Sequence, residues 1–285
     1  MARNSKQWLA RPDLESGEMV DPRIYTDEGI FKEEQEKILD KSWLVACHES
    51  ELPEPHDFRT YQHPGGHNLI IVRDEDSQIH AYLNICPHRG NLLVYEPAGS
   101  FREASPSGGP RRITCLFHAW AFDTKGNCVD MPRRKEGYQE RVQLSDYALR
   151  EVRLEVAYGG FVWVNMDDNG PALKDTLGGS LDAIAHTLTE PLEVFHYHRS
   201  IVEGNFKMWH DTNSEFYHDY MHYHNRITGM MHPGYWEREY VAFEGGHAQV
   251  TDMDLKYDSY KGHEQRTLGW PGLGANRWAL VDVFP

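Results

Sequence analysis

The chain has few cysteines, no long apolar run and a polar N-terminus. Only Cys47, Cys86, Cys115 and Cys128 occur among its 285 residues, too few to build a disulfide framework in a chain of this size. No stretch approaches the roughly 18 consecutive apolar residues that predict a membrane-spanning helix. The first residues lack the apolar core of a signal peptide. We therefore expect a cytoplasmic protein.

Basic residues are also scarce, and the formal net charge is −15. This balance argues against nucleic-acid binding, which needs a basic surface. The proportions of hydrophobic residues (40%) and charged residues (26%) are those of an ordinary globular protein. At 285 residues the chain is near the size at which one hydrophobic core gives way to two domains. The sequence contains no internal repeat.

The residue pattern predicts the α+β class, with a β-rich module between two mixed segments. The predicted limits are 1–44 for the N-terminal segment, 45–155 for the module and 156–285 for the C-terminal segment. An early helix is predicted from Thr26, which is a plausible N-cap. Other predicted elements are a strand–turn–strand at 67–85, a hairpin at 121–131, strands at 158–168 and 192–204, and a helix at 205–224.

Two short motifs each pair a cysteine with a histidine on a turn after a predicted strand. "CPHRG" contains Cys86 and His88, and "CLFHAW" contains Cys115 and His118. Two thiolates and two imidazoles could bind a structural zinc ion or a Rieske [2Fe–2S] cluster, in which one iron has two Cys and the other two His. In a zinc finger, one motif supplies both cysteines and the other motif supplies both histidines. Here each motif supplies one ligand of each kind, which favours the cluster.

These two motifs resemble the signature of the Rieske non-haem iron oxygenases. The resemblance implies an all-β Rieske domain inserted in a mixed, helix-grip-like catalytic domain. The gap of 26 residues between His88 and Cys115 is longer than in most members, and is similar to that of α subunits that act on methanesulfonate. The implied function is a terminal oxygenase that uses NADH and O₂ to convert methanesulfonate to formaldehyde and sulfite. Alternatives are an aromatic-ring-hydroxylating or demethylating oxygenase, and an electron carrier without catalytic iron.

A second constellation falls on the predicted helix at 205–224. Asp211, Glu215, His218 and His222 are spaced i, i+4, i+7 and i+11, which places them on one helical face. Such a face is also typical of the solvated side of an amphipathic helix. With a cluster upstream, we favour a mononuclear Fe(II) site, which takes two histidines and one carboxylate and leaves positions open for O₂ and substrate.

The family resemblance implies roles for several of these residues. It matches Asn205-Phe206-Lys207, followed by Glu215 and His218. Glu215 would join the cluster of one subunit, through His118, to the iron of the next. Asp211 is grouped with Glu215 as a catalytic candidate. The second iron ligand is His222, with His224 as the alternative.

Three further expectations complete the site. The third, carboxylate ligand is expected beyond residue 285, with Asp282 as the alternative. Arg226, just past the iron ligands, is the candidate to bind a small anionic substrate, because a sulfonate needs a charged donor. The resemblance also implies a small β subunit, a ferredoxin and an NADH reductase as partners, in an α3 or α3β3 assembly.

Overall fold

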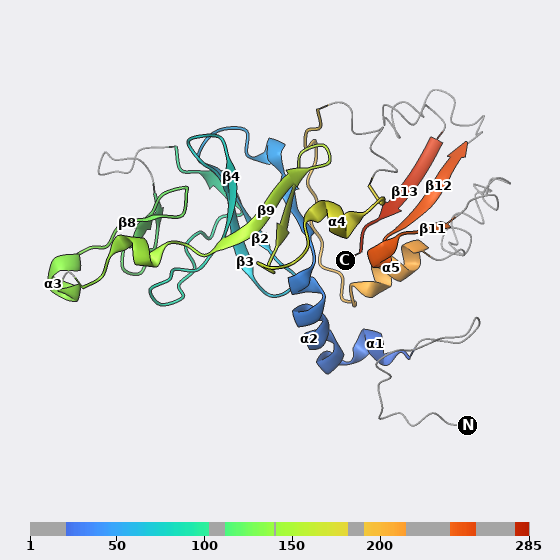
Figure 1. Ribbon diagram of the computed structural model, residues 1–285, viewed down its shortest axis with the longest axis horizontal. Coiled ribbons are helices and arrows are strands. Elements are labelled where there is room, and N and C mark those ends of the chain that lie inside the picture. Colours follow the sequence, from blue (N-terminus) through green and yellow to red (C-terminus); the bar gives the residue numbers. More distant parts are fainter. Residues whose placement is uncertain are drawn as a thin grey trace.

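The computed structural model describes residues 21–102, 112–139, 141–181, 191–214, 240–254 and 277–284. Antiparallel sheets form the framework of this part of the chain, with short helices around them (Figure 1). The α+β class predicted from the sequence is confirmed. Among the described residues, no helix is long and apolar enough to cross a lipid bilayer.

A seven-stranded sheet forms the centre of the molecule. Its spatial order is β1 (Leu44–His48), β10 (Phe161–Asn165), β9 (Glu151–Ala157), β4 (Ile79–Leu83), β3 (Asn68–Arg73), β2 (Asp57–Gln62) and β5 (Ala98–Ser100). The predicted strand–turn–strand is the β3–β4 hairpin, whose turn is closed by Asp74 accepting from the backbone N–H groups of Asp76 and Gln78. Because β1 pairs with β10, the sheet extends past residue 155. The domain limits themselves remain a prediction.

The apolar run in β3 reflects burial of both faces of this sheet. Successive side chains of a strand point to opposite faces. Leu69 and Ile71 accordingly pack in one core cluster, with Val162 of β10. Ile70 and Val72 pack in another, which also contains Cys86 and Cys115. The two Cys–His motifs therefore begin in the hydrophobic core on one face of the sheet.

A small sheet of β6 (Ile113–Thr114), β7 (Ala121–Phe122) and β8 (Cys128–Asp130) carries the second motif between β6 and β7. The predicted hairpin at 121–131 is confirmed as β7–β8. Gly126 occupies its turn at φ 80°, a conformation that glycine adopts without strain. α3 (Arg134–Tyr138) and a 3₁₀ turn, η3 (Leu144–Tyr147), follow this sheet at one end of the molecule (Figure 1).

The N-terminal helices are α1 (Arg23–Thr26) and α2 (Glu28–Lys37), and two 3₁₀ turns follow, η1 (Leu39–Lys41) and η2 (Glu49–Glu51). The predicted N-cap was wrong by one residue. Asp27, not Thr26, accepts from the N–H groups of Gly29 and Ile30. A carboxylate is also favoured there by the helix dipole.

The C-terminal part contains α4 (Leu173–Leu177), α5 (Lys207–Ser214), β11 (Tyr240–Ala242), η6 (Glu244–Gly246), β12 (Ala248–Asp254) and β13 (Arg277–Asp282). The last three strands form a separate sheet in the order β11-β12-β13. α5 packs beside it, with the rings of Phe206 and His210 centred 6.2 and 4.8 Å from that of Phe284.

The strand predicted at 192–204 was wrong, because these residues join no ladder. Val194 N donates instead to Ser50 Oγ at 3.0 Å, and the Arg59 guanidinium lies 4.9 Å from the centre of the Tyr197 ring. Phe195 and Ile201 are almost fully exposed. Among the described strands, none pairs with this β-prone segment.

Candidate metal centre

The two Cys–His motifs fold into turns with the same backbone hydrogen bonds. In the first, Cys86 N donates to Asn91 O at 2.8 Å, and Gly90 N donates to Cys86 O at 2.9 Å. In the second, Cys115 N donates to Trp120 O and Ala119 N to Cys115 O, at the same two distances. We call these turns, Cys86–Asn91 and Cys115–Trp120, the two clips. Each begins at a buried thiol and returns the chain to the core after five residues.

The fifth residue of each clip has a positive φ. Gly90 has φ 73° and Ala119 has φ 58°. Glycine populates this left-handed region freely, whereas alanine is strained there. Since the chain tolerates Ala119 in this conformation, the hydrogen bonds around it must hold the turn in place.

The two thiols lie together at the base of the clips. Cys86 and Cys115 are each only 2% exposed. Burial raises the pKa of the Cys86 thiol to about 11, the backbone N–H groups of His88 and Arg89 oppose this rise, and the adjacent Cys115 adds to it. Asn91 Nδ2 donates to Cys115 Sγ at 3.7 Å. Both sulfurs thus have N–H donors suited to a thiolate that binds metal.

The two imidazoles lie next to each other but in unequal surroundings. Their ring centres are 4.7 Å apart. His88 is half-buried and stacks parallel to the Trp120 indole, with an interplanar angle of 7° and centres 4.7 Å apart. His118 is exposed and contacts Phe117, 4.2 Å away. Burial and the neighbouring His118 both lower the pKa of His88, which favours the neutral ring that a metal binds.

The donor set fits a two-iron cluster better than a single ion. Two thiols and two imidazoles lie in adjacent pairs, and in the described part of the chain no three His, Cys, Asp or Glu side chains converge as one metal ion requires. A zinc ion would draw all four donors to one point. A Rieske cluster needs only pairs, one pair for each iron. All four cysteines are free thiols, and Cys47 and Cys128 are buried as expected.

Of the predicted mononuclear iron site, the structure describes only Asp211, in the second turn of α5. Its carboxylate accepts a hydrogen bond from Tyr25 Oη at 2.5 Å. The remaining predicted residues lie outside the described part of the chain, and their roles stay predictions: Glu215, His218, His222, His224 and Arg226. Asp282 ends β13, and its side chain is not described.

The motif Asn205-Phe206-Lys207 begins α5 and fixes its position. Asn205 Oδ1 accepts from Lys207 N at 3.1 Å, as an N-cap residue does. Lys207 Nζ then reaches back to α2, where both carboxylate oxygens of Glu34 lie 2.8 Å away. Sequence reasoning did not find the partners Tyr25 and Glu34, because they lie more than 170 residues from α5 along the chain and share no local pattern with it.

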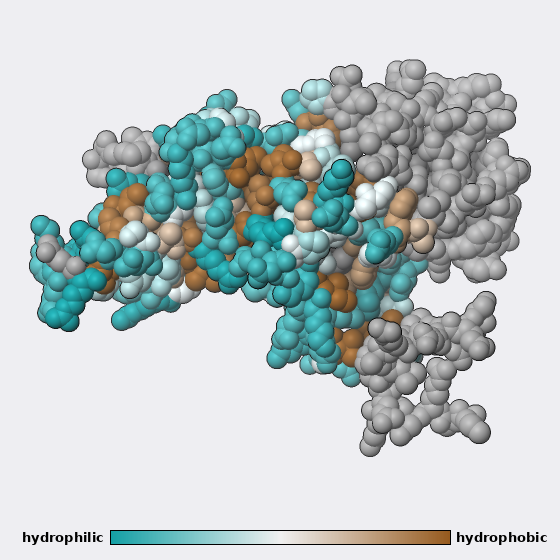
Figure 2. Space-filling view, in the orientation of Figure 1, coloured by the Kyte–Doolittle hydropathy of each residue, from teal (hydrophilic) through white to brown (hydrophobic). Residues whose placement is uncertain are grey.

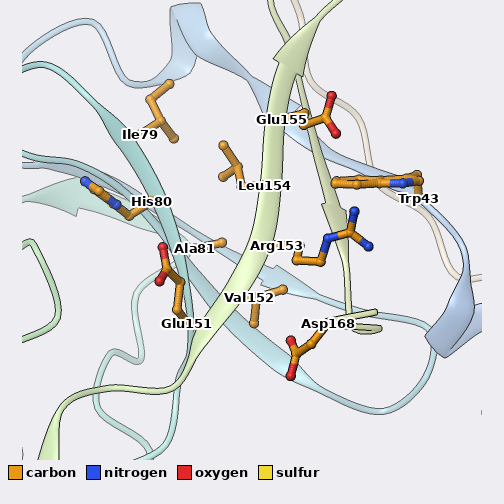
Figure 3. A pocket seen from close by; sticks show the side chains of 10 residues that line it. All are labelled: Trp43, Ile79, His80, Ala81, Glu151, Val152, Arg153, Leu154, Glu155 and Asp168. Carbon is orange, nitrogen blue, oxygen red and sulfur yellow. The ribbon is translucent and has the colours of Figure 1, made fainter. Parts of the chain in front are cut away.

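A groove of about 360 Å³ lies on the seven-stranded sheet, away from the clips (Figure 3). Figure 2 shows apolar side chains gathered over this part of the molecule, around β4 and β9. Two of its charged side chains are already engaged. Arg153 donates to the carbonyl oxygens of Asp167, Gly170 and Pro171, and stacks 4.9 Å over the Trp43 ring. Glu155 accepts from Leu173 N. We therefore do not assign the groove to the active site.

Comparison with known proteins supports the metal assignment. Residues 42–151 match the model of the Rieske [2Fe-2S] domain. The whole chain is 51% identical to the methanesulfonate monooxygenase hydroxylase subunit alpha of Methylosulfonomonas methylovora and covers 69% of it. It is 34% identical to the 2-aminobenzenesulfonate 2,3-dioxygenase subunit alpha of Alcaligenes sp, of which it covers 71%. A structure of naphthalene 1,2-dioxygenase with bound indole has the same fold, with a TM-score of 0.74 and 22% identity over 91% of this chain and 63% of that one.

Proposed function

The chain belongs to the Rieske non-haem iron oxygenases, and from this premise we propose that it is an oxygenase α subunit that hydroxylates methanesulfonate. It is an oxidoreductase, as its relatives are. The observation that carries the substrate assignment is 51% identity over the full chain to a subunit named for methanesulfonate. The second relative is named for another sulfonate. The substrates after which these two relatives are named thus both carry a sulfonate group.

The reaction consumes O₂, two electrons from NADH and two protons. One oxygen atom enters the methyl C–H bond and the other leaves as water. The resulting hydroxymethanesulfonate loses its C–S bond, the electron pair stays on sulfur, and the hydroxyl proton leaves, so that formaldehyde and sulfite form. The electrons reach the oxygenase through a reductase and a ferredoxin.

Cys86, His88, Cys115 and His118 would hold the [2Fe–2S] cluster. When bound, such a cluster passes single electrons at a potential raised by its two neutral imidazoles. The chain supports that task through its own contacts. Asn91 donates to the Cys115 sulfur, and the Trp120 indole fixes the plane of the His88 ring. The N–H groups directed at the sulfurs stabilise negative charge on them.

The mononuclear iron would take His218 and His222, or His224 in place of the latter, and a carboxylate beyond residue 285 or Asp282. Glu215 would bridge this site to the cluster of a neighbouring subunit through His118. Exposure of the His118 ring supports this, because that ring is free to meet a partner. Arg226 would bind the sulfonate. By its spacing in the sequence, Asp211 would lie on the same helical face as Glu215, His218 and His222.

An exposed apolar rim around the clips supports assembly with other copies and partners. Leu116 and Phe117 are 77% and 64% exposed, and Ile85 lies beside the first clip at 43%. Exposed large apolar side chains that lie close together are typical of an interaction surface, and these three residues lie in or directly beside the two clips. We propose that this rim, defined as Ile85, Leu116 and Phe117, contacts a neighbouring α subunit in an α3 or α3β3 assembly, with a small β subunit in the latter.

A substrate panel tests the assignment. Holoenzyme reconstituted without oxygen, with reductase and ferredoxin, is expected to consume NADH and O₂ with methanesulfonate and to release sulfite and formaldehyde in equal amounts. 2-Aminobenzenesulfonate and benzoate are the comparison substrates. Faster coupled turnover of either would favour the aromatic-ring-hydroxylating alternative. A Rieske cluster without O₂ consumption on any substrate would support an electron carrier instead.

A further inference from the structure

The last residue of each clip contacts a candidate cluster ligand of the other clip. Asn91 ends the first clip and Trp120 ends the second, and the carbonyl oxygen of each accepts from the N–H of its own clip's cysteine at 2.8 Å. The side chain of Asn91 reaches the other clip, where Nδ2 donates to Cys115 Sγ at 3.7 Å. The Trp120 indole stacks on the His88 ring, with centres 4.7 Å apart. Equivalent positions thus carry an amide that meets a sulfur and an indole that meets an imidazole.

The side-chain amide of Asn91 is held in one orientation by a second acceptor. Its Nδ2 also donates to the Leu92 carbonyl oxygen at 2.7 Å, so the two N–H bonds of the amide have two acceptors. Leu92 in turn forms an antiparallel bridge with Ile85, which directly precedes the first clip. The backbone beside the clip therefore directs the amide at the Cys115 sulfur.

Another residue, Asn84, holds the chain on both sides of the first clip. Asn84 is fully buried, and its Oδ1 accepts from the N–H groups of Leu93 and Val94 at 3.1 and 2.9 Å. Its Nδ2 donates to Val94 O at 2.7 Å. The segments that enter and leave the clip are thus joined without the side chain of Asn91. Removing the Asn91 amide therefore leaves these contacts in place and changes the surroundings of the sulfur.

A hydrogen bond to a ligand sulfur affects the reduction potential of an iron–sulfur cluster. Reduction adds one electron to the cluster, and an N–H group directed at a ligand sulfur stabilises the added negative charge. The donor therefore favours the reduced state and raises the potential. Cys115 is only 2% exposed, so water competes little for its sulfur and the amide acts at low local dielectric.

We propose that Asn91 is a positioning residue that raises the reduction potential of the [2Fe–2S] cluster through its hydrogen bond to the Cys115 sulfur. In the step concerned, a reduced ferredoxin loses one electron and the cluster gains it, and no covalent bond forms or breaks. The proposal rests on the four cluster ligands assigned under the proposed function. It does not depend on the substrate, because the potential is a property of the cluster and its surroundings.

The test is an anaerobic redox titration of the holoenzyme without substrate, followed through the paramagnetic signal of the reduced cluster. Asn91→Leu removes the donor and keeps a side chain of similar size. We expect the equilibrium constant for one-electron reduction to fall about tenfold, which lowers the midpoint potential by roughly 59 mV. The Fe–S(Cys) stretching bands in the resonance Raman spectrum should shift as well, because one thiolate loses its donor. Asn169→Leu makes the same change in an exposed turn after β10 and should match the wild type.

A second variant decides the matter if the leucine variant does not assemble a cluster. Asn91→Asp keeps the shape of the side chain but replaces the N–H donor with a negatively charged oxygen, so it should lower the potential further than Asn91→Leu. An unchanged or raised potential in either variant would overturn the proposal alone. Loss of the cluster from both variants would also overturn it, since Asn91 would then be needed for assembly. A wild type without a Rieske signal would overturn it together with the proposed function.

Discussion

The matching positions of Gly90 and Ala119 in the two clips allow a paired substitution with opposite expected effects. The left-handed backbone conformation costs a non-glycine residue about 1–2 kcal/mol. Alanine offsets about 0.4–1 kcal/mol of this cost relative to glycine, because its unfolded state has lower conformational entropy. A Cβ on Gly90 would meet no atom within 4 Å, so backbone strain alone sets the effect there. Gly90→Ala should therefore destabilise the clip by about 1 kcal/mol. Ala119→Gly should stabilise it by roughly 0.5–1 kcal/mol, because the exposed methyl group loses little contact.

The assay follows bleaching of the cluster absorption as the holoenzyme is heated at one scan rate, because cofactor loss makes unfolding irreversible. At the same scan rate, Gly90→Ala should bleach at a lower temperature than the wild type and Ala119→Gly at a higher one. Gly137→Ala is the matched control. It makes the same chemical change inside α3, where a Cβ also meets no atom within 4 Å, and should raise stability. If Gly90→Ala raised the midpoint as Gly137→Ala does, the strain argument would be wrong.

Three other predictions concern the surrounding fold. Burial lowers the pKa of His63 from its ordinary 6.5 to about 4. The neutral ring's contribution to stability is therefore complete above pH 6.5 and is lost as the pH falls toward 4. His63→Asn should remove ~1 kcal/mol of the acid destabilisation between pH 7.5 and 5.5, measured by urea unfolding at both pH values. Gly126→Ala should destabilise the β7–β8 hairpin by more than ~2 kcal/mol in the same urea assay, because its Cβ would lie 2.6 Å from the Tyr82 ring and φ is positive. Arg153→Lys should cost roughly 1–3 kcal/mol, since a lysine cannot bond three carbonyl groups and stack on Trp43 together; an unchanged thermal midpoint would contradict that account.

The parts of the fold that sequence could predict are those fixed by local pattern. The β3–β4 hairpin follows from two apolar runs around Asp74, and the β7–β8 turn follows from Gly126. The four candidate cluster ligands can be picked out from the sequence because each clip carries its own cysteine and histidine within four residues. Residue type alone could not predict that the N-cap is Asp27 and not Thr26, since both threonine and aspartate cap helices well.

Long-range contacts could not be predicted in the same way. The hydrogen bond between Tyr25 and Asp211 spans 186 residues, and neither residue belongs to a pattern that identifies the other. The strand expected at 192–204 failed for a related reason. A strand needs a partner as well as β-prone residues, and Val194 bonds to a serine side chain instead.

The one-residue difference between the clips makes their histidines unequal. His88 is two residues after its cysteine and His118 is three after its own, while the backbone hydrogen bonds of the two turns are the same. The rings therefore leave equivalent turns at different positions and cannot be related by symmetry. His88 is held against Trp120 of the other clip, whereas His118 is left exposed beside Phe117. In the assembly that we propose, a hydrogen-bonding partner from another subunit would reach His118 more readily than His88, because the spacing of the motif leaves the His118 ring exposed.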